Sequence, residues 1–337
     1  MDHTSKNTPQ ALHFAFQKLR HFSTKYTTGL PLLSLPLLGL ILLASTLSTG
    51  AQTRLGFDIS NATIPEKEIR RGGPPPDGIP SIDQPQFTPA HAVNFLQDDD
   101  IVIGFIHEGE VRAYPFRILT WHEIVNDTVG GLPVAVTYCP LCGTAMIVQR
   151  RFDETTLTFG VSGLLYNSDV LMFDRETDSL WSQLGLKSVS GKYVGTEMQW
   201  LPSEQMTWAA WKERYPESQV LNLNTGHRRD YFNLPYASYF LSRGTMFPYE
   251  RNRSDLEPKV WVAGVRHSGA EKAYPLEQLP SGKWLKDTIG EASVTLRYTA
   301  ENGHFEIRDA QGKVLPAVHV FWFAWQAFYP ETALWSR

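Results

Sequence analysis

Short apolar runs separated by turn residues dominate this chain, and they predict strands more often than helices. The runs Ile101 to Ile106 and Val111 to Tyr114 flank Glu108-Gly109, a pair typical of a hairpin turn. Two segments instead have the period of a helix, because their apolar residues recur on one face: Arg117 to Val125 and Trp208 to Tyr215. The pattern therefore predicts strands in hairpins with a few helices between them.

Turn and cap residues add detail to this prediction. Thr88-Pro89 predicts a short helix that reaches Phe95, with Thr88 as N-cap and Pro89 at the first helical position. Gly130-Gly131 is expected to end the helix that begins at Arg117. The apolar run Val134 to Tyr138 then predicts a strand. The predicted fold class is α+β and β-rich, with antiparallel strands and short helices.

The second half of the chain repeats the first. A shift of 160 residues places Val102 to Tyr138 on Val262 to Tyr298 with 13 identities. A later piece, Trp208 to Glu217, recurs as Trp322 to Glu331 at a shift of 114 residues. We interpret the pattern as two related antiparallel-strand units that arose by internal duplication. The second unit is shorter, because about 46 residues are missing from its middle (160 minus 114).

These boundaries divide the chain into five parts. Composition and repeats predict a signal peptide or anchor at 1–51, a Pro- and Gly-rich arm or linker at 52–87, a first unit at 88–222, a connection at 223–255 and a second unit at 256–337. Only the first unit contains cysteine, so we expect it to hold the chemistry and the second to act as scaffold.

The N-terminal segment predicts export. A basic stretch precedes the apolar run Leu30 to Ala44, which is broken by prolines and followed by the small residues Thr49 and Ala51. Cleavage before Gln52 would release the protein into the periplasm or the extracellular space, where disulfides persist. The alternative is an uncleaved segment that anchors the protein to the membrane through residues 30–47.

Charge narrows the choice of partners. The whole chain has a formal net charge of −4, and loss of residues 1–51 removes four basic residues and one acidic residue, which gives −4 − 3 = −7. A mildly acidic protein is not expected to bind nucleic acid. Contact with a membrane is expected only through the N-terminal segment, if that segment is not cleaved.

Cys139 and Cys142 are the only cysteines in the chain, and they form a Cys-x-x-Cys pair directly after a predicted strand. Such a pair can exchange thiol and disulfide, bind a soft metal or form an inert bridge. A bridge across so short a loop is a weak structural constraint. Covalent haem is excluded, because Gly143 stands where that motif needs histidine.

His122 and the segment after Phe159 supply the other candidates. His122 is expected to lower a thiol pKa or act as a third metal ligand, although a packed, hydrogen-bonded histidine is an equal alternative. A second cluster could complete the pocket and bind a cofactor, although Asp174 and Arg175 also fit ordinary turn chemistry. This cluster consists of Asn167, Ser168, Asp169, Asp174 and Arg175.

Several long motifs extend over most of the chain: Trp121 to Asp127, Tyr138 to Ala145, Phe159 to Gly163, Asn167 to Asp169, Met172 to Arg175, and Ser179 to Trp181. With them, the sequence from Ile82 to Leu334 resembles the exported bacterial proteins of the domain of unknown function 3179 family. The resemblance implies that certain residues belong to the family pattern, namely His122, Cys139, Cys142, Asn167, Ser168, Asp169, Asp174 and Arg175. It implies no activity.

Two hypotheses about function follow. In the first, an exported protein uses Cys139 and Cys142, with His122, for thiol-disulfide exchange or for binding a copper or zinc ion, without an organic cofactor. Its partner would be a small molecule, a metal or a thiol-disulfide protein. In the second, the chain is a non-catalytic binding module, and the two cysteines form a structural disulfide that shapes a ligand pocket.

Overall fold

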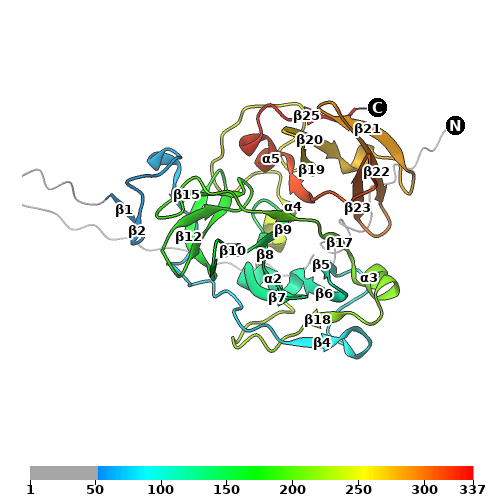
Figure 1. The fold of residues 1–337 in the computed structure, drawn as a ribbon, viewed down its shortest axis with the longest axis horizontal. Coiled ribbons are helices and arrows are strands. Elements are labelled where there is room, and N and C mark those ends of the chain that lie inside the picture. The colour runs from blue at the N-terminus through cyan, green and yellow to red at the C-terminus, as the bar shows by residue number, and fades with distance from the viewer. Residues whose placement is uncertain (1–51, 337) are drawn as a thin grey trace, which may run out of the picture.

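The computed structural model describes residues 52–336 and shows a β-rich protein (Figure 1). Most strands belong to antiparallel sheets, and the described residues include four short α-helices. The predicted fold class is thus confirmed. Residues 1–51, and with them the predicted signal peptide, lie outside the described part of the chain. Between residues 52 and 336, no helix has the length and apolarity needed to cross a membrane.

The first sheet holds the predicted hairpin β5–β6. Its strand order is β17-β5-β6-β18-β4, and only β6 and β18 run parallel. Helix α2 (Phe116–His122) follows β6, and α3 (Trp208–Arg214) follows β17. The strand bounds are Phe87–Pro89 for β4, Ile101–His107 for β5, Glu110–Pro115 for β6, Glu204–Thr207 for β17 and Gln219–Leu221 for β18.

The helix predicted from Thr88 to Phe95 is wrong. Residues Phe87–Pro89 form β4, and only the single 3-10 turn η2 (Ala90–Ala92) follows. Thr88 pairs with Val220 of β18, so sheet pairing with a distant segment overrides the local cap signal.

The helix predicted from Arg117 to Val125 ends earlier than expected. Glu123 takes a positive φ of 58°, and the chain turns into β7 (Ile124–Val129). Gly130 and Gly131, both at positive φ, form the hairpin turn between β7 and β8 and do not end the helix. The apolar residues Ile124 and Val125 fit the helical period, but they are buried in a strand.

Two further sheets complete the first unit. One has the order β16-β9-β8-β7, and the other has the order β15-β14-β13-β12-β3. The bounds are Arg70–Arg71 for β3, Leu132–Cys139 for β8, Thr144–Gln149 for β9, Phe159–Tyr166 for β12, Asp169–Asp174 for β13, Leu180–Ser182 for β14, Lys187–Ser190 for β15 and Trp200–Leu201 for β16. Small hairpins join β1 (Thr53–Arg54) to β2 (Phe57–Asp58) and β10 (Arg151–Phe152) to β11 (Thr155–Thr156), and η1 spans Glu66–Glu68.

The second unit repeats the strand order of the first sheet. Its order β24-β19-β20-β25 matches β17-β5-β6-β18, again with a parallel last pair. Val262 pairs with Pro275 as Val102 pairs with Pro115. The duplication itself stays a prediction. The bounds are Trp261–His267 for β19, Ala270–Pro275 for β20, Leu285–Ile289 for β21, Ala292–Thr299 for β22, His304–Asp309 for β23, Ala317–Phe321 for β24, Trp322–Phe328 for α5, Ala333–Leu334 for β25 and Leu276–Gln278 for η3.

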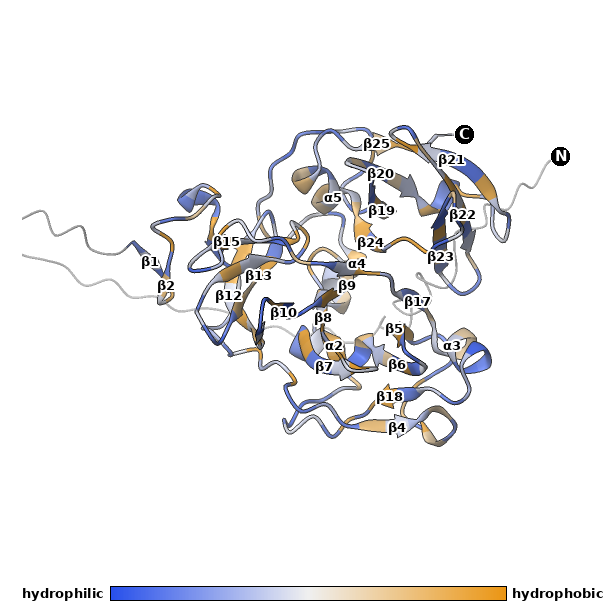
Figure 2. Ribbon diagram, viewed as in Figure 1, coloured by the Kyte–Doolittle hydropathy of each residue, from blue (hydrophilic) through white to orange (hydrophobic). Residues whose placement is uncertain are grey.

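The largest core cluster joins the two units. It contains Cys139, Leu141 and Cys142 together with Phe321 and Trp322 of the second unit. Figure 2 shows apolar stretches on β12 and β24, whereas the outer loops are mostly hydrophilic. The connection, which contains α4 (Ala237–Leu241), also packs here, because Tyr239 belongs to the same cluster. The cysteines therefore lie where both units and the connection meet.

Candidate functional site

The cysteines occupy the hairpin that joins β8 to β9. Cys139 pairs with Thr144, which leaves a four-residue loop, and the N–H of Cys142 donates to the carbonyl oxygen of Cys139 at 3.2 Å. Gly143 has a φ of 71°, and a Cβ there would lie 2.3 Å from the ring of Trp261. Glycine is thus required for this turn to pack against the second unit.

A second hairpin brings Asp169 to the same place. Asn167 and Ser168 form the two-residue turn between β12 and β13, and both have positive φ, as a type I′ turn requires. The carbonyl oxygen of Ser168 accepts from the thiol of Cys142 at 3.3 Å and lies 3.8 Å from the sulfur of Cys139. Asp169 is the next residue, at the start of β13.

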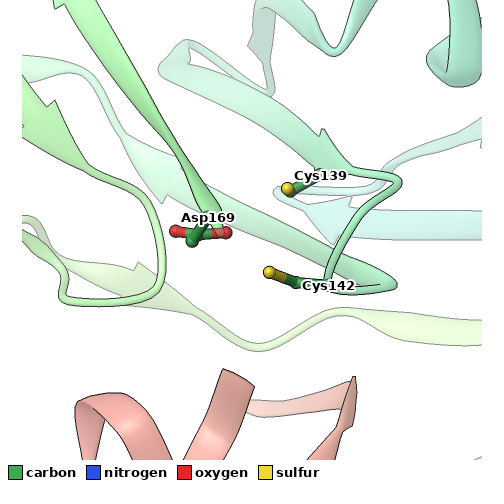
Figure 3. Close-up of side chains that lie close together, drawn as sticks. All are labelled: Cys139, Cys142 and Asp169. Atoms are coloured by element: carbon green, nitrogen blue, oxygen red, sulfur yellow. The ribbon is translucent and has the colours of Figure 1, made fainter. Parts of the chain in front are cut away.

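Cys139, Cys142 and Asp169 form one buried cluster. One ligand atom from each lies within 4.8 Å of the other two, and Figure 3 shows the sulfurs and the carboxylate turned toward a common centre. Both thiols are free, not joined as a disulfide. The Oδ2 atom of Asp169 accepts from the N–H of Leu184 at 2.9 Å, whereas Oδ1 has no hydrogen-bond partner among the described residues.

Burial disfavours the charged forms of the groups in this cluster. It raises the pKa of the Cys139 thiol, and the carboxylates of Asp169 and Glu123 add to that effect. It raises the pKa of Cys142 well above its usual value. Burial also raises the pKa of Asp169 to about 7, although the N–H of Leu184 and the two neighbouring thiols act in the opposite direction. A reactive thiolate needs a neighbouring positive charge, and the charges that act on Cys139 are negative.

Glu123 lines a small cavity beside the cluster. The cavity has a volume of about 50 Å³, and Cys139 and Tyr236 also line it. Burial, together with the charge of Asp169, raises the pKa of Glu123 to about 8. No hydrogen bond or ion pair to the Glu123 carboxyl is present within residues 52–336. At the shift of 160 residues, Glu123 corresponds to Lys283 of the second copy, so this carboxyl belongs to the first unit alone.

Asn167 and Ser168 hold the connection in place. The Oδ1 atom of Asn167 accepts from the N–H of Glu250 at 2.8 Å, and the hydroxyl of Ser168 donates to the carbonyl oxygen of Phe247 at 2.8 Å. Their side chains thus bind the segment that covers the site, while the backbone of Ser168 faces the thiols. The connection also reaches the cysteine turn directly, because the Tyr239 hydroxyl donates to the carbonyl oxygen of Leu141 at 2.7 Å.

Asp174 and Arg175 are engaged elsewhere in the fold. The Asp174 carboxylate accepts from the N–H of Thr177 at 2.7 Å and from the indole N–H of Trp181 at 2.8 Å. Arg175 makes two hydrogen bonds to Asp77 of the arm, at 2.6 and 2.9 Å. The contact with Thr177 matches the turn-chemistry alternative for Asp174, whereas Arg175 instead holds the distant arm.

The structure does not bring His122 into the cysteine cluster. Its Nδ1 lies 2.7 Å from the carbonyl oxygen of Pro80, and its Nε2 lies 2.7 Å from the hydroxyl of Tyr231. Burial lowers its pKa to about 4. The ring therefore matches the alternative of a packed, hydrogen-bonded histidine. Strand β7, which was not expected, separates His122 from the cysteine-bearing strand.

The comparisons with known proteins identify a family. The family described as Protein of unknown function (DUF3179) matches residues 76–332. No curated protein and no solved structure matches the chain. Because the family match covers most of the sequence, as the motif resemblance led us to expect, this chain belongs to the DUF3179 family of proteins of unknown function.

Proposed function

We propose that the protein is an exported metal-binding protein, and that Cys139, Cys142 and Asp169 hold one divalent ion of borderline softness, with Zn²⁺ as the best match. The unpaired Oδ1 of Asp169 carries this proposal. A buried carboxylate oxygen without a partner is costly, and a metal ion bound between it and two thiolates would satisfy it.

The spacing of the ligand atoms supports this site. Zinc binds sulfur at about 2.3 Å and carboxylate oxygen at about 2.0 Å, so tetrahedral ligands lie roughly 3.3 to 3.8 Å apart. The three atoms here already lie within 4.8 Å of one another. Small side-chain rotations would close the remaining gap.

The donor set and the charge favour Zn²⁺ over Cu⁺. Two thiolates and one carboxylate carry a charge of −3. The net charge of the occupied site is therefore −1 with a divalent ion and −2 with a monovalent one. Burial penalises each uncompensated charge. A carboxylate also suits a borderline divalent ion better than the soft Cu⁺.

Thiol-disulfide exchange is less well supported. The attacking sulfur must be a thiolate, and both thiols here have raised pKa values because of burial and neighbouring carboxylates. A metal ion would supply the positive charge that the site lacks, and binding would release the thiol protons.

A titration of the reduced, metal-free protein with Cd²⁺ tests the proposal, because thiolate-to-cadmium charge transfer is visible in the ultraviolet. We expect one Cd²⁺ per chain and displacement of Cd²⁺ by Zn²⁺. The double variant Cys139→Ser, Cys142→Ser should show no charge-transfer band. Absence of the band in the wild-type protein, or an unchanged band in the double variant, would refute the proposal.

A further inference from the structure

The cavity beside the cysteine cluster bears on the fourth coordination position of the proposed metal ion. This inference rests on the proposed function. The cluster supplies three protein ligands. A structural zinc site has four protein ligands, whereas a site with three keeps a position for water or a substrate. The remaining position needs space, and only a cavity that touches the ligands can provide it.

That cavity lies against Cys139. Cys139 is the only one of the three ligands that lines it. The arm contributes Gly72, Gly73 and Pro74 to its wall, and the N–H of Gly72 donates to the carbonyl oxygen of Gly163 at 2.9 Å. A water molecule needs roughly 10 to 15 Å³ of such volume. At about 50 Å³, the cavity has room for a few waters but not for a cofactor or a peptide.

The wall of the cavity is mostly apolar, and Glu123 is the only carboxyl group among the residues that line it. Glu123 is 7% exposed, and no described residue donates a hydrogen bond to its carboxyl. The backbone at Glu123 is held in the left-handed region by two hydrogen bonds, from its N–H to Leu119 and from Tyr138 to its carbonyl oxygen, each 2.7 Å. Backbone strain at a buried glutamate that lines a cavity is a feature that clusters at functional positions.

We propose that the bound ion keeps an open fourth position toward this cavity, that water or a similarly small neutral oxygen donor occupies it, and that Glu123 is its hydrogen-bond partner. A neutral ligand fits the charge of the site, because three anionic ligands already leave −1 with a divalent ion. The fourth position would then make this a reactive type of site and not a purely structural one. Glu123 acts through the bound water, so it is a positioning residue.

Cobalt substitution tests this proposal, because Co²⁺ replaces zinc and gives an electron paramagnetic resonance (EPR) signal. We would load the reduced protein with Co²⁺ in ordinary water and in water enriched in oxygen-17. A bound water broadens the signal in enriched water only. The Glu123→Gln variant should keep the broadening, change the g values and lower Co²⁺ affinity by about tenfold at most. Glu306→Gln, a matched buried glutamate of the second unit, should leave the signal unchanged.

The outcomes distinguish failure of the proposed metal site from failure of its open fourth position. If Co²⁺ does not bind to the cysteines at all, the proposed function itself fails. If Co²⁺ binds but oxygen-17 causes no broadening, the fourth position is closed and this inference is overturned. If Glu123→Gln lowers Co²⁺ affinity by more than about a hundredfold, the carboxylate is itself a ligand and water is not. If its signal equals that of the wild type, Glu123 is not the partner.

Discussion

A carboxylate oxygen of Asp169 lies within 4.8 Å of the sulfur of Cys142, although the two residues lie in hairpins of different sheets. Each hairpin places its residue by backbone geometry, the first through Gly143 and the second through the turn at Asn167 and Ser168. The pairing joins a motif that is visible in the sequence to a residue that only the fold brings close.

The first prediction concerns Asp169 as a ligand. Asp169→Asn should weaken Zn²⁺ or Cd²⁺ binding at least about tenfold, because it replaces an anionic ligand by a neutral amide. The charge-transfer band should persist at saturation, since both thiolates remain. Asp127→Asn is the control, because that carboxylate is also buried but binds Arg112 and Tyr114. Equal affinities in the wild type and Asp169→Asn would remove Asp169 from the site.

The second prediction separates metal binding from folding. Cys139→Ser and Cys142→Ser should each abolish tight metal binding, yet lower the free energy of unfolding of the metal-free protein by only about 1 to 2 kcal/mol. The reason is that both cysteines are free thiols in the structure, and a serine hydroxyl can still donate to the carbonyl oxygen of Ser168. Urea unfolding measures this. A collapse of the fold in both variants would show that the cysteines are structural.

The third prediction tests the shared framework of the two units. Tyr114 and Tyr274 occupy matching positions on β6 and β20, and both are fully buried. Tyr114→Ala and Tyr274→Ala should each cost roughly 2 to 4 kcal/mol of stability and leave the stoichiometry of metal binding unchanged. Thermal unfolding and a cadmium titration decide the matter. Stable tyrosine variants that fail to bind metal would mean that site and scaffold are assigned the wrong way round.

The fourth prediction gives His122 a role in pH-dependent stability. Burial lowers its pKa to about 4 in the folded protein, while an unfolded histidine binds a proton below about pH 6.5. The unfolded state therefore binds more protons between these values, and stability falls as the pH is lowered from 6.5 toward 4. In the wild type, the free energy of unfolding should therefore fall between pH 7 and pH 5, partly because of His122. In His122→Gln, this fall should be smaller by about 1 to 2 kcal/mol.

Denaturant unfolding at the two pH values measures that difference. The exposed His91 provides the control, and His91→Gln should keep the wild-type dependence. An unchanged pH dependence in His122→Gln would show that this histidine does not titrate differently in the two states.

Sequence patterns predicted the structure best where it depends on residues that are close together in the chain. The hairpin at Glu108-Gly109 and the helix from Trp208 formed as predicted, because turn chemistry and periodicity are local. The helix at Thr88 failed because pairing with β18 is a distant contact. The helical spacing of the apolar residues could not show that the helix ends and the chain turns at Glu123.

The same limit applies to the candidate site. Cys139 and Cys142 were found because two cysteines at this spacing are a chemical signal in any fold. Asp169 was one of five polar residues around a hairpin, and nothing in its sequence neighbours set it apart from Asp174. Glu123 and Tyr236 meet Cys139 only through the packing of α2 and the connection. His122, adjacent to Glu123, pointed to the right region but faces Tyr231.

The metal content and free-thiol count of the protein, purified from the exported fraction without chelator, test the central claim most directly. We predict one zinc ion per chain, and two free thiols once the metal is removed under denaturing, oxygen-free conditions. The Asp169→Asn protein, purified in parallel, should contain less zinc. A metal-free protein whose two cysteines form a disulfide would contradict the account.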